Sequence, residues 1–208
     1  MEAKSFPTIE ALEDDRVGPA RRRSIVWEWC DRPGLEHLLL DLDSTGHRAD
    51  GLVMVALSGI LLRLRYVIRC DAQWRFRSAA ITAESNGETR ERRIVRGDDG
   101  AWTIDGTARP DLAACSDIDI MGTPFTNTMP IRRLVLPQEQ PVAVEVVYVA
   151  VPDLAVSVAA QDYTRRDGEA MPARFRYRSL GSDFTAELSV DGDGVVIDYG
   201  AIWRRRAG

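Results

Sequence analysis

Apolar and polar side chains alternate with a period of two along much of the chain, the spacing of β-strands whose two faces meet different surroundings. In the clearest run, residues 62–70, Leu62, Leu64 and Tyr66 share one face and arginines occupy the other. Turns rich in aspartate and glycine, such as residues 97–100, separate such runs. The pattern predicts a mainly β, antiparallel protein.

Eleven such runs are expected to be strands. They cover residues 24–30, 34–42, 52–57, 62–70, 88–96, 101–104, 142–151, 155–165, 174–178, 184–190 and 195–199. A further short strand is expected at residues 74–77, paired with 62–70 as a hairpin. The run 142–151 is almost continuously apolar, which predicts a central strand buried on both faces. Glu145 would then be a buried carboxylate in need of a partner, and Arg132 or Arg133 are the candidates.

The domain organisation follows from the charge pattern. Residues 1–23 combine an acidic cluster with a run of three consecutive arginines and predict a peripheral arm, whereas residues 24–206 predict a single β domain. An aromatic and arginine-rich strand followed by an Asp/Gly turn occurs at residues 66–100 and again at residues 177–194. This recurrence suggests two similar halves that meet near residues 105–140.

Residues 111–136, called the central segment below, hold the densest specific chemistry. Asp117 and Asp119 are two positions apart, so both carboxylates are expected on one face of a strand. Thr123 can cap a helix whose first position is Pro124. That helix should be about one turn long, because Pro130 is expected to end it.

These residues provide candidates for the polar mouth of a ligand site. The candidates are Asp117, Asp119, Thr123, Thr126, Asn127, Arg132, Arg133 and Glu145. Carboxylates and amides could bind sugar hydroxyls, and guanidinium groups could bind a phosphate or carboxylate. The alternative is structural, because the same side chains commonly satisfy the backbone of turns and crossovers.

A curved sheet can also enclose an apolar chain when its inward side chains leave room. The candidate apolar lining consists of Trp27, Leu38, Leu64, Trp74, Phe125 and Tyr177, with Leu40, Leu62, Phe76 and Phe175 beside them. The alternative for each of these side chains is an ordinary packed core.

Composition narrows the partners. The net charge of −5 argues against nucleic acid. The three cysteines lack metal or disulfide spacing and suggest reduced thiols. No apolar stretch is long enough to span a bilayer, and the N-terminal residues do not resemble a secretory signal, which favours a cytoplasmic location. Oligomeric state is open between monomer and homodimer.

Catalysis is the alternative to binding. The only histidines, His37 and His47, have no spacing typical of a nucleophile or metal site, so neither a metal nor a cofactor is expected. Asp117 and Asp119 could still serve a metal- or carboxylate-dependent enzyme acting on a glycan, provided that both face solvent.

Several segments, in order along the chain, resemble the bacterial glycolipid-binding protein family, formerly a domain of unknown function. The most specific is DIDIMGTPFTNTMPIRRL, which begins at Asp117. The others are WEWCDRPGLEHLLL from Trp27, YVIRCDAQWRFR from Tyr66, PDLAVSVAAQDYT from Pro152 and YRSLGSDFTAELSVDGDGVVIDY from Tyr177. The resemblance implies a duplicated antiparallel pseudo-barrel, or wrapped curved sheet with one or two short helices, similar to lipid carriers. It implies a non-catalytic protein that binds a lipid or glycolipid, with no residue roles to transfer.

Overall fold

The chain folds into one open, strongly curved sheet. The computed structural model describes residues 21–57, 59–168 and 170–208. The strands are β1 (Arg21–Trp29), β2 (Gly34–Leu42), β3 (Gly46–Leu57), β4 (Ile60–Asp71), β5 (Phe76–Ser85), β6 (Glu88–Arg96), β7 (Trp102–Ile104), β8 (Thr107–Ala108), β9 (Asp117–Ile120), β10 (Pro141–Val149), β11 (Val156–Arg165), β12 (Ala173–Ser179), β13 (Thr185–Val190), β14 (Val196–Tyr199) and β15 (Trp203–Ala207). The helices are the 3-10 helices η2 (Pro110–Leu112) and η3 (Phe125–Asn127) and the α-helix α1 (Thr128–Arg133).

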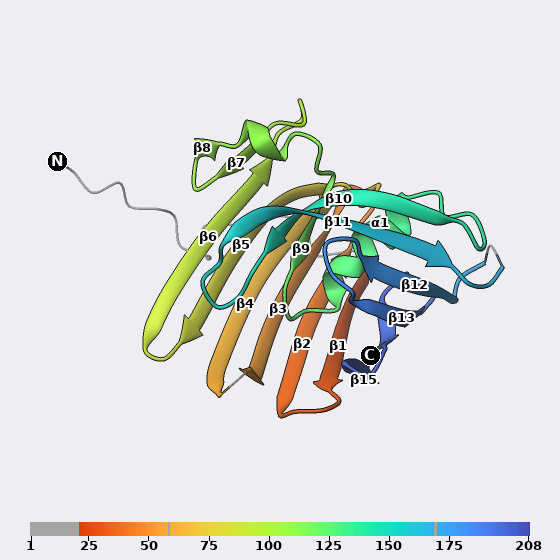
Figure 1. The fold of residues 1–208 in the computed structure, drawn as a ribbon, viewed down its shortest axis with the longest axis horizontal. Helices are drawn as coiled ribbons and strands as arrows, with labels where there is room; N and C mark the ends of the chain where they lie inside the picture. The colour runs from red at the N-terminus through yellow and green to blue at the C-terminus, as the bar shows by residue number, and fades with distance from the viewer. Residues whose placement is uncertain (1–20, 58, 169) are drawn as a thin grey trace.

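The strand order explains how the sheet wraps. It runs β8-β7-β6-β5-β4-β3-β2-β1-β15-β14-β13-β12-β11-β10-β9, so the sheet ends at β8 and β9 and is not closed. The strands β1 to β8 are called the first half below, and β9 to β15 the second half. Strands β10 and β11 pass across the first-half strands, and the helical part of the central segment lies between the two halves (Figure 1). Neighbouring strands are antiparallel except for β9 and β10, which pair in parallel. The mainly β, wrapped-sheet fold expected from the alternation is therefore confirmed.

Several strands lie where the alternation predicted them. β6 covers the predicted residues 88–96, and β4 extends the predicted run by two residues at its start and one at its end. The third strand was predicted to begin at residue 52, after a loop, and this start is wrong, since β3 already begins at Gly46 and pairs with β2. Polar side chains interrupt the apolar pattern there, but the ladder is formed by backbone groups and does not depend on the polarity of the side chains.

The arginines before the first predicted strand also belong to the sheet. β1 begins at Arg21, whereas the predicted arm extended to residue 23; its first twenty residues lie outside the described residues. Arg23 forms an ion pair with Asp191 at 2.8 Å, and Arg205 of β15 binds the same carboxylate at 2.7 Å. These pairs link β1 and β15, the two strands that join the halves, to the turn before β14.

The prediction that residues 142–151 form a strand buried on both faces holds for only one end of β10. Residues 146–149 are buried or half-buried there, whereas Pro141, Ala143 and Glu145 are exposed at the other end. β10 is second from the end of the sheet. Glu145 points to the exposed face, so this carboxylate needs no buried arginine.

Pro130 does not end the helix of the central segment. It lies in the first turn of α1, where the missing N–H has no helical acceptor to lose. The expected cap is present in substance: Thr123 Oγ1 accepts a hydrogen bond from the backbone N–H of Phe125, the first residue of η3. The helical part is therefore longer than the single turn predicted.

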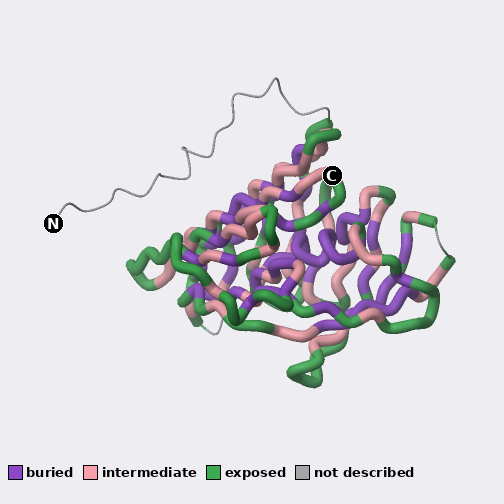
Figure 2. Tube along the Cα trace, turned by 90° about the horizontal axis from the view of Figure 1, so that it is seen from above, coloured by how far each residue is buried: buried purple, intermediate pink, exposed green. Residues whose placement is uncertain are grey.

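The core has two clusters. The larger joins both halves and includes Leu38, Leu64 and Trp102 from the first-half strands together with Val147 and Val149 of β10. The smaller is formed mainly by side chains of the strands from β10 to β14 and contains the rings of Tyr163, Phe175 and Tyr177. Buried residues accordingly follow the inner face of the curved sheet and the central segment (Figure 2).

Candidate functional site

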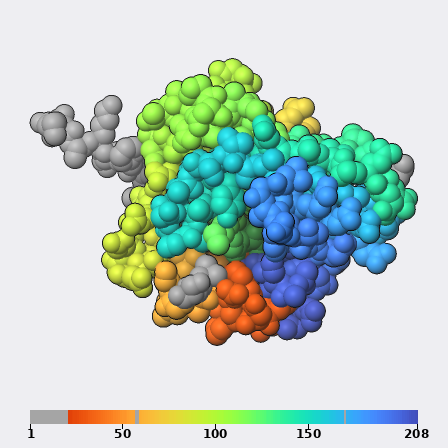
Figure 3. Space-filling view, viewed as in Figure 1, coloured from red at the N-terminus to blue at the C-terminus, as the bar shows by residue number. Residues whose placement is uncertain are grey.

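The central segment occupies the concave side of the sheet. Phe125 and Met129 are buried in the same cluster as Trp27 and Leu38. Thr126 and Asn127, predicted to line a mouth, are also buried. The segment reaches the surface between first-half strands and the strands from β10 onward, where it is green in Figure 3. Thr126 and Asn127 thus belong to a helical element packed inside the wrapped sheet.

Asp117 is held in an internal ion pair. Its side chain is fully buried, and Arg133 Nη2 donates to its carboxylate at 2.5 Å. Ser116 Oγ donates to the same carboxylate oxygen at 3.1 Å and accepts from Arg133 at 2.9 Å. The sequence correctly placed Asp117 and Asp119 on one strand face, but the enzyme alternative needs both to face solvent, and Asp117 does not.

Asp119 lies on the same face and keeps some accessible surface. Thr126 donates to its Oδ1 at 2.9 Å, and Gln161 of β11 donates to its Oδ2 at 2.5 Å. Burial raises the pKa of the Asp119 carboxyl, and these two hydrogen bonds act in the opposite direction. A half-buried carboxylate is therefore fixed in position by donors on two different elements.

Asn127 belongs to the same neighbourhood. Its Nδ2 donates to the carbonyl of Pro124 at 3.1 Å, and its Oδ1 accepts from the Tyr163 hydroxyl at 2.9 Å. Sequence reasoning did not single out Gln161 or Tyr163. The alternation of β11 shows that the two share a face, but their proximity to the central segment depends on long-range pairing of β9, β10 and β11.

A second buried carboxylate, Glu36 of β2, was missed altogether. It is 0% exposed, and its Oε1 accepts hydrogen bonds from Tyr66 and, at 2.8 Å, from Thr123. Its Oε2 is buried without a hydrogen-bond partner among the described residues. Burial raises the pKa of Glu36 to about 8, although both hydrogen bonds oppose the rise. The sequence signal was its position, since Glu36 lies on the same strand face as the buried Leu38 and Leu40.

Arg132 and Arg133 diverge from each other. Arg133 points inward to Asp117, whereas Arg132 is exposed and its aliphatic stem packs beside Gly194, where a Cβ would stand 2.6 Å from Arg132 Cδ. Glu145, the remaining polar candidate, lies on the exposed face of β10. The structure therefore brings together Asp119, Thr126 and Asn127, but not Arg132 or Glu145.

All the apolar candidates are buried in the core. The larger cluster contains Trp27, Leu38, Leu40, Leu62, Leu64, Trp74, Phe76 and Phe125, and the smaller contains Phe175 and Tyr177. Trp74 reaches the core from a turn with a φ of 62°, rather than from a strand. Phe125 stacks on Tyr66 with a centroid distance of 6.3 Å, so the central segment packs directly on β4.

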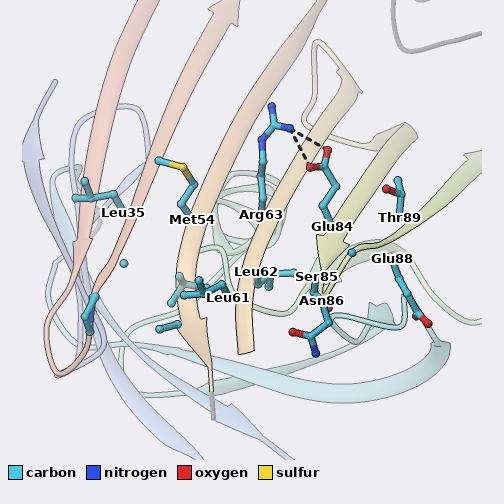
Figure 4. A pocket seen from close by; sticks show the side chains of 15 residues that line it. Leu35, Met54, Leu61, Leu62, Arg63, Glu84, Ser85, Asn86, Glu88 and Thr89 are labelled. Carbon is cyan, nitrogen blue, oxygen red and sulfur yellow. Dashed lines mark hydrogen bonds and ion pairs between the residues drawn. The ribbon is translucent and has the colours of Figure 1, made fainter. Parts of the chain in front are cut away.

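A pocket of about 610 Å³ lies elsewhere, at the turn ends of β2 to β6. Its side chains form a row in register across five strands: Leu35, Met54, Arg63, Glu84 and Thr89. Leu61 is 77% exposed and Met54 53% exposed. Arg63 donates to Glu84 at 2.9 Å in the middle of the row (Figure 4). Apolar and polar groups thus share one pocket that sequence reasoning did not identify.

A family model described as "Putative glycolipid-binding" matches residues 24–205. The chain belongs to this family. Among solved structures, it is similar to a DUF1089 family protein from Pseudomonas aeruginosa, with 35% identity and a TM-score of 0.71 over 82% of this chain and 92% of that chain. A beta-barrel-like protein with the domain of unknown function DUF1849 from Brucella abortus is 9% identical, with a TM-score of 0.48 over 92% of this chain and 98% of that chain. No curated protein matches.

The resemblance to the glycolipid-binding family seen in the sequence is thus confirmed. Two observations narrow the chemistry further. Within the described residues, no three His, Cys, Asp or Glu side chains come together as a potential metal site. Across the same residues, no helix has the length and apolarity needed to cross a membrane. The described residues offer two places for a ligand: the Asp119 carboxylate, held by Thr126 and Gln161, and the mixed apolar and polar pocket at the turn ends of β2 to β6.

Proposed function

We propose that the protein binds a glycolipid or similar amphiphile in the pocket at the turn ends of β2 to β6. The family description supports a ligand with an apolar chain and a hydroxyl-rich headgroup. The observation that carries the proposal is the row across the five strands, which is apolar at Leu35 and Met54 and polar at Arg63, Glu84 and Thr89. This placement differs from the sequence-based prediction, which put the apolar chain of the ligand among residues that pack in the core.

The pocket has the size and chemistry for such a ligand. Small-molecule sites typically have volumes of roughly 300–1,000 Å³, and this one is about 610 Å³. An alkyl chain lying on Leu35, Met54 and Leu61 would cover their exposed surface, and each buried methylene contributes about 0.8 kcal/mol. Arg63, Glu84 and Thr89 offer donors and acceptors to hydroxyl groups over the polar part of the row. Binding of this kind requires no catalytic group.

The test uses the fluorescent apolar probe N-phenyl-1-naphthylamine and the full chain. The probe should brighten on binding and be displaced by decyl maltoside below its micelle concentration, whereas maltose alone should not displace it. Met54→Glu should weaken probe binding at least tenfold, because it places a charge on the apolar end of the row. The fold should tolerate this change, since Met54 is exposed and pairs with Arg63 across β3 and β4.

Leu61→Ser should also weaken binding of the probe, because it removes an exposed apolar side chain from the pocket. Leu180→Ser is the matched control, because Leu180 is also an exposed leucine (48%) but lies outside the pocket. Equal probe binding by Met54→Glu, Leu61→Ser and the unaltered protein would reject the pocket as the binding site. Failure of decyl maltoside to displace the probe would reject the proposal that the ligand is an amphiphile.

A further inference from the structure

Aromatic rings from β10 to β14 lie near Asp119, whose partner Gln161 also contacts the Tyr163 hydroxyl. Tyr148 is the register partner of Asp119 on β10, so the two side chains lie next to each other. Tyr177, Tyr199 and Phe184 form a mutual cluster with centroid distances of 5.9 to 6.2 Å. None of these residues lines the pocket described above. This second place is therefore a separate candidate for ligand binding.

The cluster is partly open to solvent. Phe184 is 39% exposed, and Tyr148, Tyr199 and Asp119 are half-buried. The other rings of the group, Tyr163 and Tyr177, are buried beneath them and contact each other at 5.5 Å. A rigid, buried layer thus supports a partly exposed layer that combines ring faces with a carboxylate.

The carboxylate is oriented and retains acceptor capacity. Thr126 and Gln161 each donate one hydrogen bond to Asp119, and a carboxylate has about four lone-pair sites. Burial is the largest cause that raises the pKa of the Tyr148 and Tyr199 hydroxyls, and the negative charge of Asp119 is the second. This effect agrees with a short distance between Asp119 and the two rings. Those hydroxyls consequently stay protonated at neutral pH and can donate to a ligand.

We propose that Asp119, Tyr148, Tyr199 and Phe184 bind a neutral, hydroxyl-rich ring such as a pyranose. The C–H face of a sugar ring is apolar and slightly positive, and it complements the negative face of an aromatic ring. Hydroxyl groups on the ring edge donate to Asp119 in charge-assisted hydrogen bonds. A phosphate or carboxylate ligand is disfavoured, because Asp119 would repel it. The sugar can be free or the headgroup of a glycolipid.

The inference goes beyond the proposed function, because the site is distinct from the amphiphile pocket and can fail independently. Saturation-transfer difference NMR on the full chain tests it, since irradiated protein protons saturate ligand C–H groups that touch the rings. The probes are methyl β-D-glucopyranoside, methyl β-D-galactopyranoside and methyl α-D-mannopyranoside, with octyl β-D-glucopyranoside below its micelle concentration as the headgroup arm. At least one probe should show saturation of its ring protons.

Two variants locate that signal. Asp119→Asn keeps the shape and removes the charge, and Phe184→Ala removes an exposed ring whose loss the fold should tolerate. Each should lower the ring-proton signal at least tenfold, while Leu180→Ser, on the connection between β12 and β13, should leave it unchanged. Signal from a methyl glycoside supports free-sugar binding, and signal only from the octyl glucoside ring supports headgroup binding. Saturation confined to alkyl protons, no signal from any probe, or full signal in both variants would overturn the proposal.

Discussion

The ring of Tyr66 lies where a side chain of Gly51 would stand: a Cβ on Gly51 would be 2.1 Å from Tyr66 Cζ. The two residues are register partners on β3 and β4. The absence of a side chain at Gly51 lets the ring lie across β3 and direct its hydroxyl to Glu36 on β2. Gly51 is therefore a requirement of the buried hydrogen-bond network.

Gly51→Ala should destabilise the protein by about 2–4 kcal/mol, because the buried Tyr66 ring would have to move and its hydrogen bonds would be lost. Chemical unfolding followed by circular dichroism measures this. Gly192→Ala is the matched control, since a Cβ there meets nothing within 4 Å, and it should change stability by less than about 0.5 kcal/mol. Equal stability of the two variants would show that Tyr66 does not depend on Gly51.

Glu36 should make stability depend on pH. Its folded-state pKa of about 8 lies above the value of 4.5 expected for an exposed glutamate, so the folded state binds the proton more tightly. Its contribution is therefore fully present below pH 4.5 and is lost as the pH rises through 8. The loss between pH 5 and 8 is on the order of 3 kcal/mol.

Glu36→Gln removes this titration and keeps a carbonyl oxygen for Tyr66 and Thr123. The stability of the variant relative to the unaltered protein should rise between pH 5 and pH 8, as measured by urea unfolding at each pH. Other titrating groups are common to both proteins and cancel in the difference. A difference that stays constant across this range would mean that Glu36 does not titrate there.

The sequence predicted which face each residue occupies better than it predicted what that residue contacts. Asp117 and Asp119 were placed on one strand face from their spacing alone, because strand periodicity is local. The partners of Asp119 were not predicted, since Gln161 lies 42 positions away and meets it through long-range strand pairing. Glu36 carried a local signal of burial, but its contacts with Tyr66 and Thr123 depend on how the sheet wraps.

The same distinction limits what the sequence predicted about the candidate site. The sequence correctly singled out the aromatic and leucine positions as apolar and inward, but periodicity cannot tell a hollow interior from a filled one. The central segment fills that space with Phe125 and Met129. The pocket lies on a row from Leu35 to Thr89, where exposure of Met54 and Leu61 results from sheet register and turn geometry.

The ion pair between Arg133 and Asp117 should contribute far more than a surface pair. Arg133→Met would leave the fully buried Asp117 carboxylate without its charged partner, and removal of one partner of a buried pair typically costs about 3–5 kcal/mol. Arg90→Met is the control, because the Arg90–Glu88 pair on β6 is exposed and should contribute at most about 1 kcal/mol. Adding Asp117→Asn to Arg133→Met should recover part of the loss in urea unfolding. Similar costs for the two arginine variants would contradict this account.

The three cysteines should differ sharply in reactivity. Cys30 is exposed, whereas Cys70 and Cys115 are buried, and all three are free thiols, as the sequence spacing predicted. Burial raises the pKa of Cys115 to about 11 and that of Cys70 further, so both remain protonated thiols at pH 8.

Only the thiolate reacts with a disulfide reagent such as dithionitrobenzoate. The folded protein should therefore release one equivalent of the coloured thiolate quickly, and Cys30→Ser should abolish this phase, while urea-unfolded protein should release three. Rapid release from folded Cys30→Ser would mean that the sheet opens around Cys70 or Cys115 far more readily than the packed core implies.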